Sequence, residues 1–311
     1  MAGSAEETMA GRGGAVAAPA DVTGATNAEK RAVREGVLTG ERALFKSRGV
    51  RVEGCVFEDG ESPLKESRDV EVVDSVFRWK YPLWYCRDVT VRRTAFLEMS
   101  RSGLWYTDNV AVLDSTVEAP KEFRRCRGVR IERTSFANAA ETLWTCSDVE
   151  LADVSARGDY FAKDCSRLSA RNFQLVGNYC FDGGSDIAID GARMLSKDSF
   201  WNCENVVVRN ATIIGEYIGW NSRNLTFENC TIESLQGFCY VDGLTLRDCR
   251  LINTTRAFEY CHGLDVRSTT RVASVVNPFD GVISAPGIDE VVFDDPEVDR
   301  SATRLELDDR G

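Results

Sequence analysis

The chain has 311 residues, of which 43% are hydrophobic, and its 49 acidic side chains outnumber 38 basic ones to give a formal net charge of −11. This balance argues against nucleic acid as a main partner, because a phosphate backbone is bound by basic surfaces. Nothing approaches the run of about 20 apolar residues that spans a bilayer, so we expect no membrane partner.

The chain begins with a segment unlike the rest. Residues 1–36 are rich in Ala and Gly and show no periodicity, so we expect a disordered tail. Glu6 and Glu7 lie where a secretory signal would carry basic residues, and no sufficiently long apolar run follows. We therefore expect a cytoplasmic protein with a single domain over residues 37–295 and an acidic tail over residues 296–311.

A repeat of 19 to 21 residues runs from about Arg48 to Asp280. Its copies begin at Arg48, Arg68, Arg87, Asp108, Arg127, Ser147, Ser166, Ser185, Glu204, Arg223, Asp242 and His262. Each copy opens with a polar turn that often contains Gly, Asp or Asn. Apolar residues then occupy the third and fifth positions, as Val50 and Val52 do in the first copy, and in most copies the tenth, as Phe57 does.

Such alternation predicts strands with one buried face. A fixed period near 20 residues, without helical spacing inside it, predicts a β-solenoid whose coils hold two or three short strands and whose like positions stack in columns. The period is too short for a propeller blade or an ankyrin unit, and the spaced leucines of a leucine-rich repeat are absent. The predicted fold is all-β, a rod of about twelve coils that is roughly 55–60 Å long at the usual strand spacing.

Most of the eleven cysteines occupy two columns of small residues, at the last and eighth positions of the coils. Stacked side chains point in parallel, so disulfides across the stack are geometrically poor and we expect buried free thiols. His262 is the only histidine and no CxxC pair occurs, so we expect no zinc site. No converging oxygen ligands for calcium can be assembled, and no cofactor is implied.

The second half of each coil carries the candidate site. Counted back from the last residue of a coil, the third residue is apolar and should point inward, so the second should point outward. Five of the six tryptophans fall in this outward column. The candidate binding residues taken from it are Trp84, Trp105, Arg124, Trp144, Asp182, Trp201 and Trp220. Further candidates from the neighbouring outward positions are Arg101, Lys121, Asp159, Lys197 and Glu216.

An indole beside hydrogen-bonding groups suits a sugar ring, and a long face with a step of ~4.8 Å suits a polysaccharide. Acid–base chemistry needs ionisable groups close together, and Asp159, Lys197 and Glu216 are the candidate catalytic residues. Asp159 and Asp182 should lie more than ~12 Å apart along the strand direction, too far for a carboxylate pair.

Two structural explanations compete with this site. The tryptophans could stack on one another or be covered by a tail or a second subunit. The charged residues could instead form salt bridges between neighbouring coils. The pairs expected in that case are Glu61 with Lys80, Lys163 with Asp182, and Lys197 with Glu216.

Several strings between Gly40 and Asp295 carry a family resemblance, among them KYPLWY (Lys80–Tyr85), SKDSFWN (Ser196–Asn202) and GEYIGWNS (Gly215–Ser222). They resemble a mainly bacterial domain-of-unknown-function family whose fold is the right-handed parallel β-helix of the pectin-lyase-like superfamily. The resemblance implies this fold but no established activity. The paired aspartates of the superfamily's hydrolases and the acidic calcium cluster with arginine of its lyases are not evident here.

Two hypotheses for the function follow. The first is a carbohydrate-interacting protein that binds an oligosaccharide on the outward face, with or without polysaccharide lyase-like or glycosidase-like activity. In a lyase reaction, Lys197 or Arg124 would neutralise a uronate. The second is a non-enzymatic scaffold that binds a protein partner or assembles as a homo-oligomer.

Overall fold

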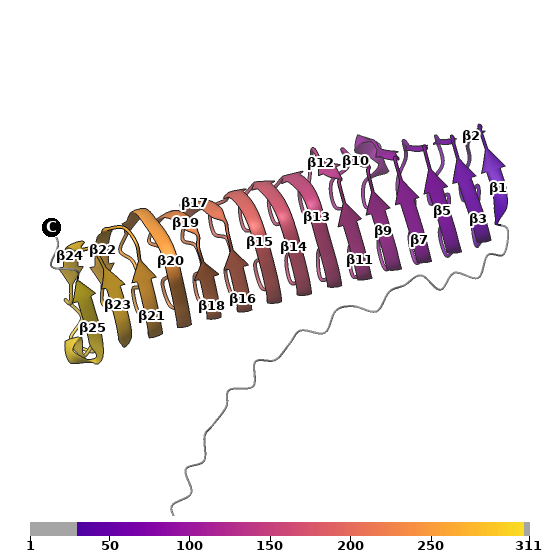
Figure 1. The fold of residues 1–311 in the computed structure, drawn as a ribbon. Coiled ribbons are helices and arrows are strands. Elements are labelled where there is room, and N and C mark those ends of the chain that lie inside the picture. Colours follow the sequence, from indigo (N-terminus) through magenta and orange to yellow (C-terminus); the bar gives the residue numbers. More distant parts are fainter. Residues whose placement is uncertain (1–29, 308–311) are drawn as a thin grey trace, which may run out of the picture.

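The computed structural model describes residues 30–307, which form a straight rod of stacked coils (Figure 1). All of its strand pairs are parallel, and each strand pairs with the corresponding strand one coil away, as Val50 does with Val70 and Val70 with Val89. The fold is therefore a parallel β-helix, as the period predicts. Among the described residues, no helix is long and apolar enough to cross a membrane.

The first strand of each coil stacks into one long sheet. Its members are β1 (Arg31–Arg34), β3 (Arg48–Glu53), β5 (Arg68–Val73), β7 (Arg87–Arg92), β9 (Asp108–Leu113), β11 (Arg127–Glu132), β13 (Ser147–Arg157), β14 (Ser166–Val176), β15 (Ser185–Leu195), β16 (Glu204–Arg209), β18 (Arg223–Glu228), β20 (Asp242–Thr255), β21 (His262–Ser268), β23 (Gly281–Ala285) and β25 (Thr303–Leu307).

A second row of strands packs behind the first. It comprises β2 (Val37–Leu38), β4 (Val56–Phe57), β6 (Val76–Phe77), β8 (Ala95–Phe96), β10 (Thr116–Val117), β12 (Ser135–Phe136), β17 (Thr212–Glu216) and β19 (Thr231–Leu235). Strands β13, β14, β15 and β20 are long enough to turn the corner and serve both rows. A separate pair, β22 (Val272–Val276) and β24 (Ile288–Val292), and the 3₁₀ turns η1 (Glu98–Ser100) and η2 (Arg300–Ala302) complete the described elements.

The rod has about 15 coils, three more than the repeat predicts. Strand β1 pairs with β3, so residues 31–34, which we assigned to the disordered tail, are the first coil. Strand β25 pairs with β23, so residues 303–307 belong to the rod and not to a tail. These terminal strands carry only part of the repeat pattern: Val33 and Leu305 pack against the core, and parallel backbone pairing with one neighbouring coil holds each strand in place. The rest of the predicted N-terminal tail, residues 1–29, lies outside the described residues.

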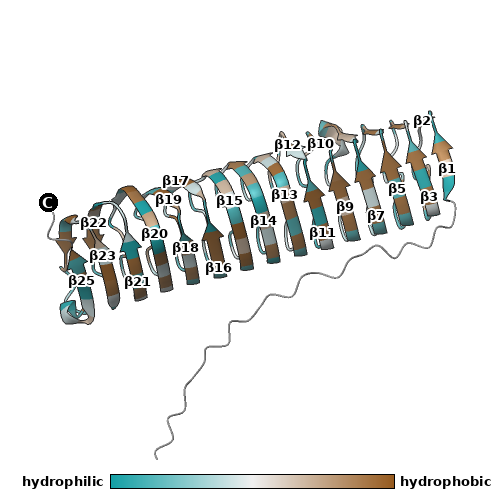
Figure 2. Ribbon diagram, in the orientation of Figure 1, coloured by the Kyte–Doolittle hydropathy of each residue, from teal (hydrophilic) through white to brown (hydrophobic). Residues whose placement is uncertain are grey.

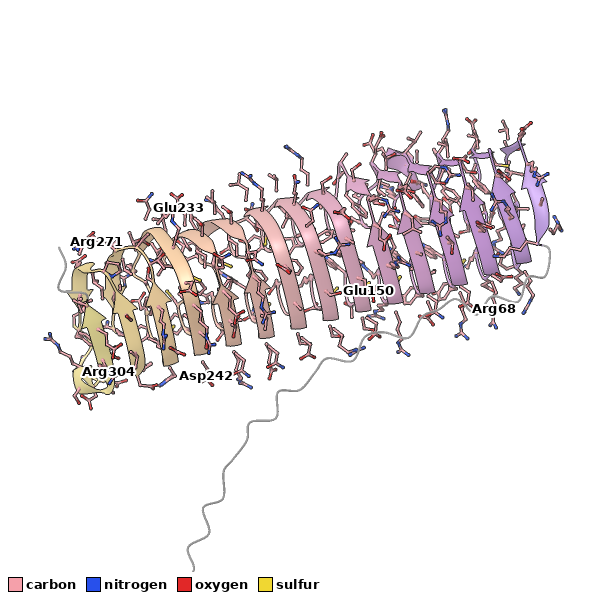
Figure 3. All side chains as sticks on the ribbon, in the orientation of Figure 1. Arg68, Glu150, Glu233, Asp242, Arg271 and Arg304 are labelled. Carbon is pink, nitrogen blue, oxygen red and sulfur yellow. The ribbon has the colours of Figure 1, made fainter. Side chains whose placement is uncertain are left out.

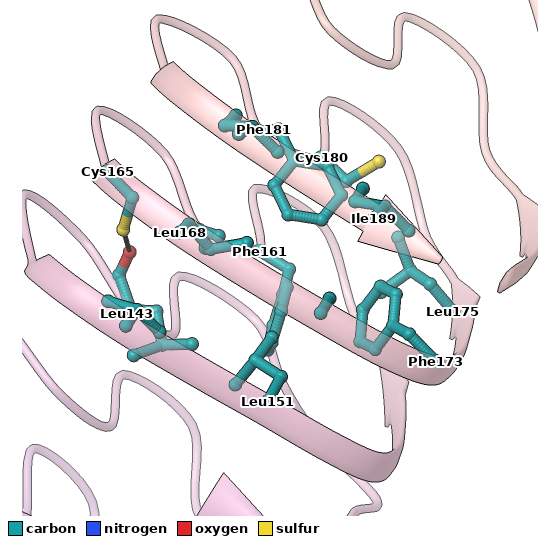
Figure 4. Packing of buried hydrophobic residues seen from close by; sticks show 14 of the residues in the cluster. Leu143, Leu151, Phe161, Cys165, Leu168, Phe173, Leu175, Cys180, Phe181 and Ile189 are labelled. Carbon is teal, nitrogen blue, oxygen red and sulfur yellow. Dashed lines mark hydrogen bonds between the residues drawn. The ribbon is translucent and has the colours of Figure 1, made fainter. Parts of the chain in front are cut away.

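The core follows the predicted alternation, with hydrophobic and hydrophilic residues alternating along the strands (Figure 2). Like positions stack: the rings of Phe57 and Phe77 lie 4.5 Å apart, and those of Phe77 and Phe96 lie 5.0 Å apart. All eleven cysteines are buried and free, as predicted. In the close view of the core, the Cys165 thiol donates to the Leu143 carbonyl of the preceding coil, at 2.9 Å (Figure 4).

The polar turn at the start of each repeat has a conformational cause. Its second residue adopts a left-handed conformation in coil after coil, with φ of 57° at Asp88, 52° at Asn109 and 68° at Gly128. Gly, Asn and Asp tolerate this region best, which explains the composition of the turn. The side chains also link the coils, since the Asn109 amide donates to the Asp88 carboxylate at 3.0 Å.

Candidate functional site

Charged side chains cover the rod along its length, with Glu233 and Arg271 on the opposite side from Glu150 and Asp242 (Figure 3). The three predicted inter-coil salt bridges are all present. Lys80 lies 3.2 Å from Glu61, Lys197 lies 2.9 Å from Glu216, and Lys163 pairs with Asp182. Each pair joins equivalent positions of adjacent coils, so its first effect is to hold the coils in register.

The tryptophans form a ladder along the rod. The indole Nε1 of Trp105 donates to the Lys121 carbonyl of the next coil, Nε1 of Trp144 to the Tyr160 carbonyl and Nε1 of Trp201 to the Tyr217 carbonyl, each at 2.8 Å. Trp84 makes the same bond to the Ser102 carbonyl. The polar edge of each of these rings is therefore satisfied within the protein and is not available to a ligand.

The ring faces in the N-terminal half of the ladder are also covered. Trp84 and Trp105 stack with centroids 5.2 Å apart and planes 6° apart. The Arg124 guanidinium is sandwiched between Trp105 and Trp144, at 4.5 and 4.6 Å from their centroids. Both faces of Trp105 and one face each of Trp84 and Trp144 are therefore occupied by the neighbouring coils, which leaves less free ring face for a sugar than the sequence suggests. Trp84 and Trp105 stack on each other, as the structural alternative expects, whereas Arg124 separates Trp105 from Trp144.

The remaining candidates of the tryptophan column, Asp182, Trp201 and Trp220, do not continue the N-terminal ladder. Asp182 is only 9% exposed, and its carboxylate is held by Lys163 and by the Asn202 amide at 3.1 Å. These coils separate the N-terminal ladder from Trp201 and Trp220, whose rings are tilted with centroids 6.0 Å apart. The five tryptophans therefore do not form one continuous strip along the rod.

Arg101 and Lys121 lie beside the N-terminal ladder. Arg101 is exposed, and the Lys121 ammonium lies 3.1 Å from the Glu141 carboxylate, which also pairs with Arg124 at 3.4 Å. Lys121 and Arg124 thus neutralise Glu141 beside the ladder.

The structure does bring titratable groups together around Lys197 and Glu216. Asp198 follows Lys197, is 8% exposed, and has its pKa raised by burial and by the nearby charge of Glu216. The charge of Asp198 in turn raises the pKa of the nearby Tyr179 hydroxyl. The sequence reasoning missed Asp198 and Tyr179 because both sit in turn positions with positive φ, outside the alternation that it followed.

Asp159 does not join this cluster. Its carboxylate accepts the Asn178 backbone N–H at 2.8 Å, and the Asn178 side-chain oxygen accepts the Lys197 backbone N–H at 3.2 Å. Asp159 and Glu216 are therefore joined by a hydrogen-bonded column but separated by three coils, roughly 14 Å at the usual strand spacing. Asp159 supports the column and is too far away to share chemistry with Glu216.

A groove runs beside the Lys197 cluster on the second row of strands. One part, about 560 Å³, is lined by Asn178, Leu195, Ser196, Lys197, Ile214, Gly215, Glu216, Glu233, Leu235 and Asn253. A second part, about 470 Å³, shares Leu195 and Ile214 with the first and extends toward Ser135. The eleventh position of the repeat supplies these aliphatic side chains, and extending the period-two alternation by one residue past the tenth position would have found them.

No group of three or more His, Cys, Asp or Glu side chains within residues 30–307 is arranged to hold a metal ion. The Lys197 cluster instead offers an ammonium, a buried carboxyl, a phenol and amide groups beside a groove. Such a set can hydrogen-bond a polyhydroxylated ligand and hold a proton near it.

The fold and this surface define a parallel β-helix protein with an open groove. The chain belongs to the family described as Protein of unknown function (DUF3737), whose model matches residues 31–306. No curated protein sequence matches it.

Several solved structures share the fold at low similarity. A surface adhesin of Streptococcus pneumoniae, PfbA, is 10% identical over 75% of this chain and 85% of its own, with a TM-score of 0.46. The A-module of the Azotobacter vinelandii mannuronan C-5 epimerase AlgE6 is 15% identical over 89% of both chains, with a TM-score of 0.37. The tailspike protein of E. coli bacteriophage HK620, in complex with a pentasaccharide, is 12% identical over 88% of this chain and 65% of its own, with a TM-score of 0.31. Similarity at this level carries nothing about activity.

Proposed function

We propose that this protein binds a linear oligosaccharide in the groove beside Lys197. The observation that carries the proposal is the set of polar side chains on three consecutive coils, Asn178, Lys197 and Glu216, next to the aliphatic side chains of Leu195 and Ile214. A sugar ring has an apolar face and a polar rim, and this wall offers matching groups of both kinds.

The repeat favours a chain of sugars over a single sugar. Each coil presents an equivalent side chain about 4.8 Å further along the rod, so one row of contacts follows the ligand for several units. The groove is open along its length, which lets a polymer enter from the side and extend beyond the site. This site replaces the tryptophan face that the sequence suggested, because the tryptophans there are engaged with neighbouring coils.

Asp198 follows the groove-lining Lys197 but is itself buried and does not line the groove. Burial and the charge of Glu216 raise the pKa of Asp198, so this carboxyl keeps its proton to a higher pH than an exposed aspartate does. Its proton is not placed against a bound ligand, and binding is therefore the activity to test.

The test compares Lys197→Met with Lys80→Met. Each variant removes an equivalent inter-coil salt bridge, and of the two lysines only Lys197 lines the groove. Binding to a panel of neutral and acidic oligosaccharides is measured by calorimetry and by thermal shift, with and without calcium. We expect at least a tenfold weaker affinity for Lys197→Met and wild-type affinity for Lys80→Met. Equal losses in both variants, or no binding by the wild type across the panel, would refute the proposal.

A further inference from the structure

An exposed aliphatic row crosses the middle of the rod on its second strand row. Val176 pairs in register with Leu195, and Leu195 with Ile214, so the three side chains lie side by side. They are 43%, 51% and 39% exposed. Contiguous aliphatic side chains on the outer face of a flat sheet are costly to leave in water and mark a contact surface.

Opposite charges flank this row at equal distances. Arg157 pairs in register with Val176 at one end, and Glu233 with Ile214 at the other. Along the rod the five positions therefore read Arg, Val, Leu, Ile and Glu, with Leu195 at the centre. Within residues 30–307 neither Arg157 nor Glu233 forms an ion pair, although Arg78, in the same column, pairs with Glu58 at 3.4 Å.

We propose that this surface binds a second copy of the same protein, with the two rods antiparallel and the twofold axis passing at Leu195. Turning the sequence Arg, Val, Leu, Ile, Glu end for end places Arg157 opposite Glu233 of the other copy. Val176 then meets Ile214, and Leu195 meets itself. The surface is thus complementary to itself in both charge and apolar character, as an isologous interface must be.

The next positions along the column extend the match. Ala137 follows Phe136, which pairs in register with Ala156, and so extends the column beyond Arg157; Ile252 pairs in register with Glu233 at the other end. The antiparallel arrangement places these two apolar residues opposite each other as well. A partner with an unrelated surface would have no reason to match both the spacing of the coils and this order, whereas a second copy has the same coil spacing by construction.

The outward row that contains Gln174, Arg193 and Thr212 brings one unfavourable contact into this dimer. Arg193 lies in the central coil, between Gln174 and Thr212, and would approach its own copy across the axis. Its partners on either side are neutral and polar. Lys197 also lies in the central coil, but its charge is paired with Glu216 at 2.9 Å. Two Arg157–Glu233 pairs per dimer therefore oppose the like-charge contact of Arg193. Charge complementarity therefore still favours the antiparallel pair.

The experiment measures the mass of the full chain in solution over a wide range of concentrations, by sedimentation or light scattering, in the absence of any saccharide. We expect a dimer for the wild type, monomers for Leu195→Asp, Arg157→Glu and Glu233→Arg, and a restored dimer for the double variant Arg157→Glu/Glu233→Arg. Arg78→Glu, the matched control in the same column, should stay dimeric.

Circular dichroism verifies that the variants fold, which is expected because all substituted side chains are on the surface. A wild type that is monomeric at every concentration would overturn the proposal. So would a dimer that tolerates Leu195→Asp, because another face would then hold it together. A second copy would cover Leu195 and Ile214, which also line the groove, so the saccharide and the second copy compete for these side chains. The proposal does not rest on saccharide binding, and Lys197→Met leaves the five-residue row intact, so the two ideas can fail separately.

Discussion

The indole Nε1 of Trp201 donates to the backbone carbonyl of Tyr217 across the gap between two coils, at 2.8 Å. Trp105 and Trp144 make the equivalent bond, each to the carbonyl of the residue 16 positions later in the chain. A tryptophan at this position thus joins one coil to the next by a hydrogen bond and by its ring contacts. The column is a structural ladder, and its residues are better tested by stability than by ligand binding.

Replacing Trp105 by Phe should destabilise the protein by about 1–2 kcal/mol, because the Lys121 carbonyl loses its donor while most of the ring packing is kept. Urea denaturation measures the change. Tyr85→Phe is the control, since Tyr85 is exposed and stacks on Tyr106 through a ring that Phe retains. Equal stability of Trp105→Phe and the wild type would contradict the structural role of the bond.

Glu122 should make stability depend on pH. Its side chain is 1% exposed, and burial raises its pKa well above the ordinary value, although the Gly103 N–H donates to it at 2.8 Å. The folded protein therefore holds this proton at pH values where the unfolded chain, with a pKa near ~4.3, has released it. Its contribution is full below that value and is lost as the pH rises through the folded pKa.

Glu122→Gln removes this titration, so its stability should fall less than that of the wild type between mildly acidic and neutral pH. Denaturant midpoints measured across that range give the two slopes. Parallel slopes for variant and wild type would show that Glu122 does not hold a proton in the folded state.

The effects of substitutions at Gly103 and Glu122 on stability should depend on each other, because the two side chains would occupy the same space. A methyl group on Gly103 would lie 2.3 Å from Glu122 Oε2, so Gly103→Ala should destabilise the protein by about 1–3 kcal/mol. The next coil carries Thr142 at the position of Glu122, which shows that a threonine fits there. Adding Glu122→Thr to Gly103→Ala should recover most of the loss. A double-mutant cycle on chemical denaturation checks this, and purely additive effects would rule the coupling out.

The contribution of each salt bridge to the free energy of unfolding should increase with its burial. Lys163→Met leaves the largely buried Asp182 carboxylate with the Asn202 amide as its remaining side-chain partner, which should cost about 1–3 kcal/mol. Lys80→Met leaves an exposed Glu61 that water can solvate, so little change is expected. Thermal and urea unfolding of the two variants test the order. A larger loss for Lys80→Met would contradict it.

The candidate site shows where sequence reasoning works in a solenoid. The columns of Lys80, Lys163 and Lys197 and their acidic partners follow from register alone, because equivalent positions of adjacent coils must be neighbours. Asp198 and Tyr179 were not found because left-handed turn residues break the alternation that assigns each side chain to a face. The role of Trp105 stayed open between two alternatives for another reason: an outward direction does not tell whether a ring faces solvent or its neighbour in the stack.

The sequence by itself determined the parallel coil, its buried cysteines and phenylalanines, and the pairing of charges between coils, since all of these depend only on a short period repeated in register. The tertiary structure decided which outward side chains remain free. That depends on distances of a few ångströms across adjacent coils, which fill the faces of Trp105 with other groups and leave Leu195 exposed beside Lys197. The tertiary structure also decided the terminal coils, because β1 and β25 join the rod through backbone hydrogen bonds and through the packing of Val33 and Leu305 against the core.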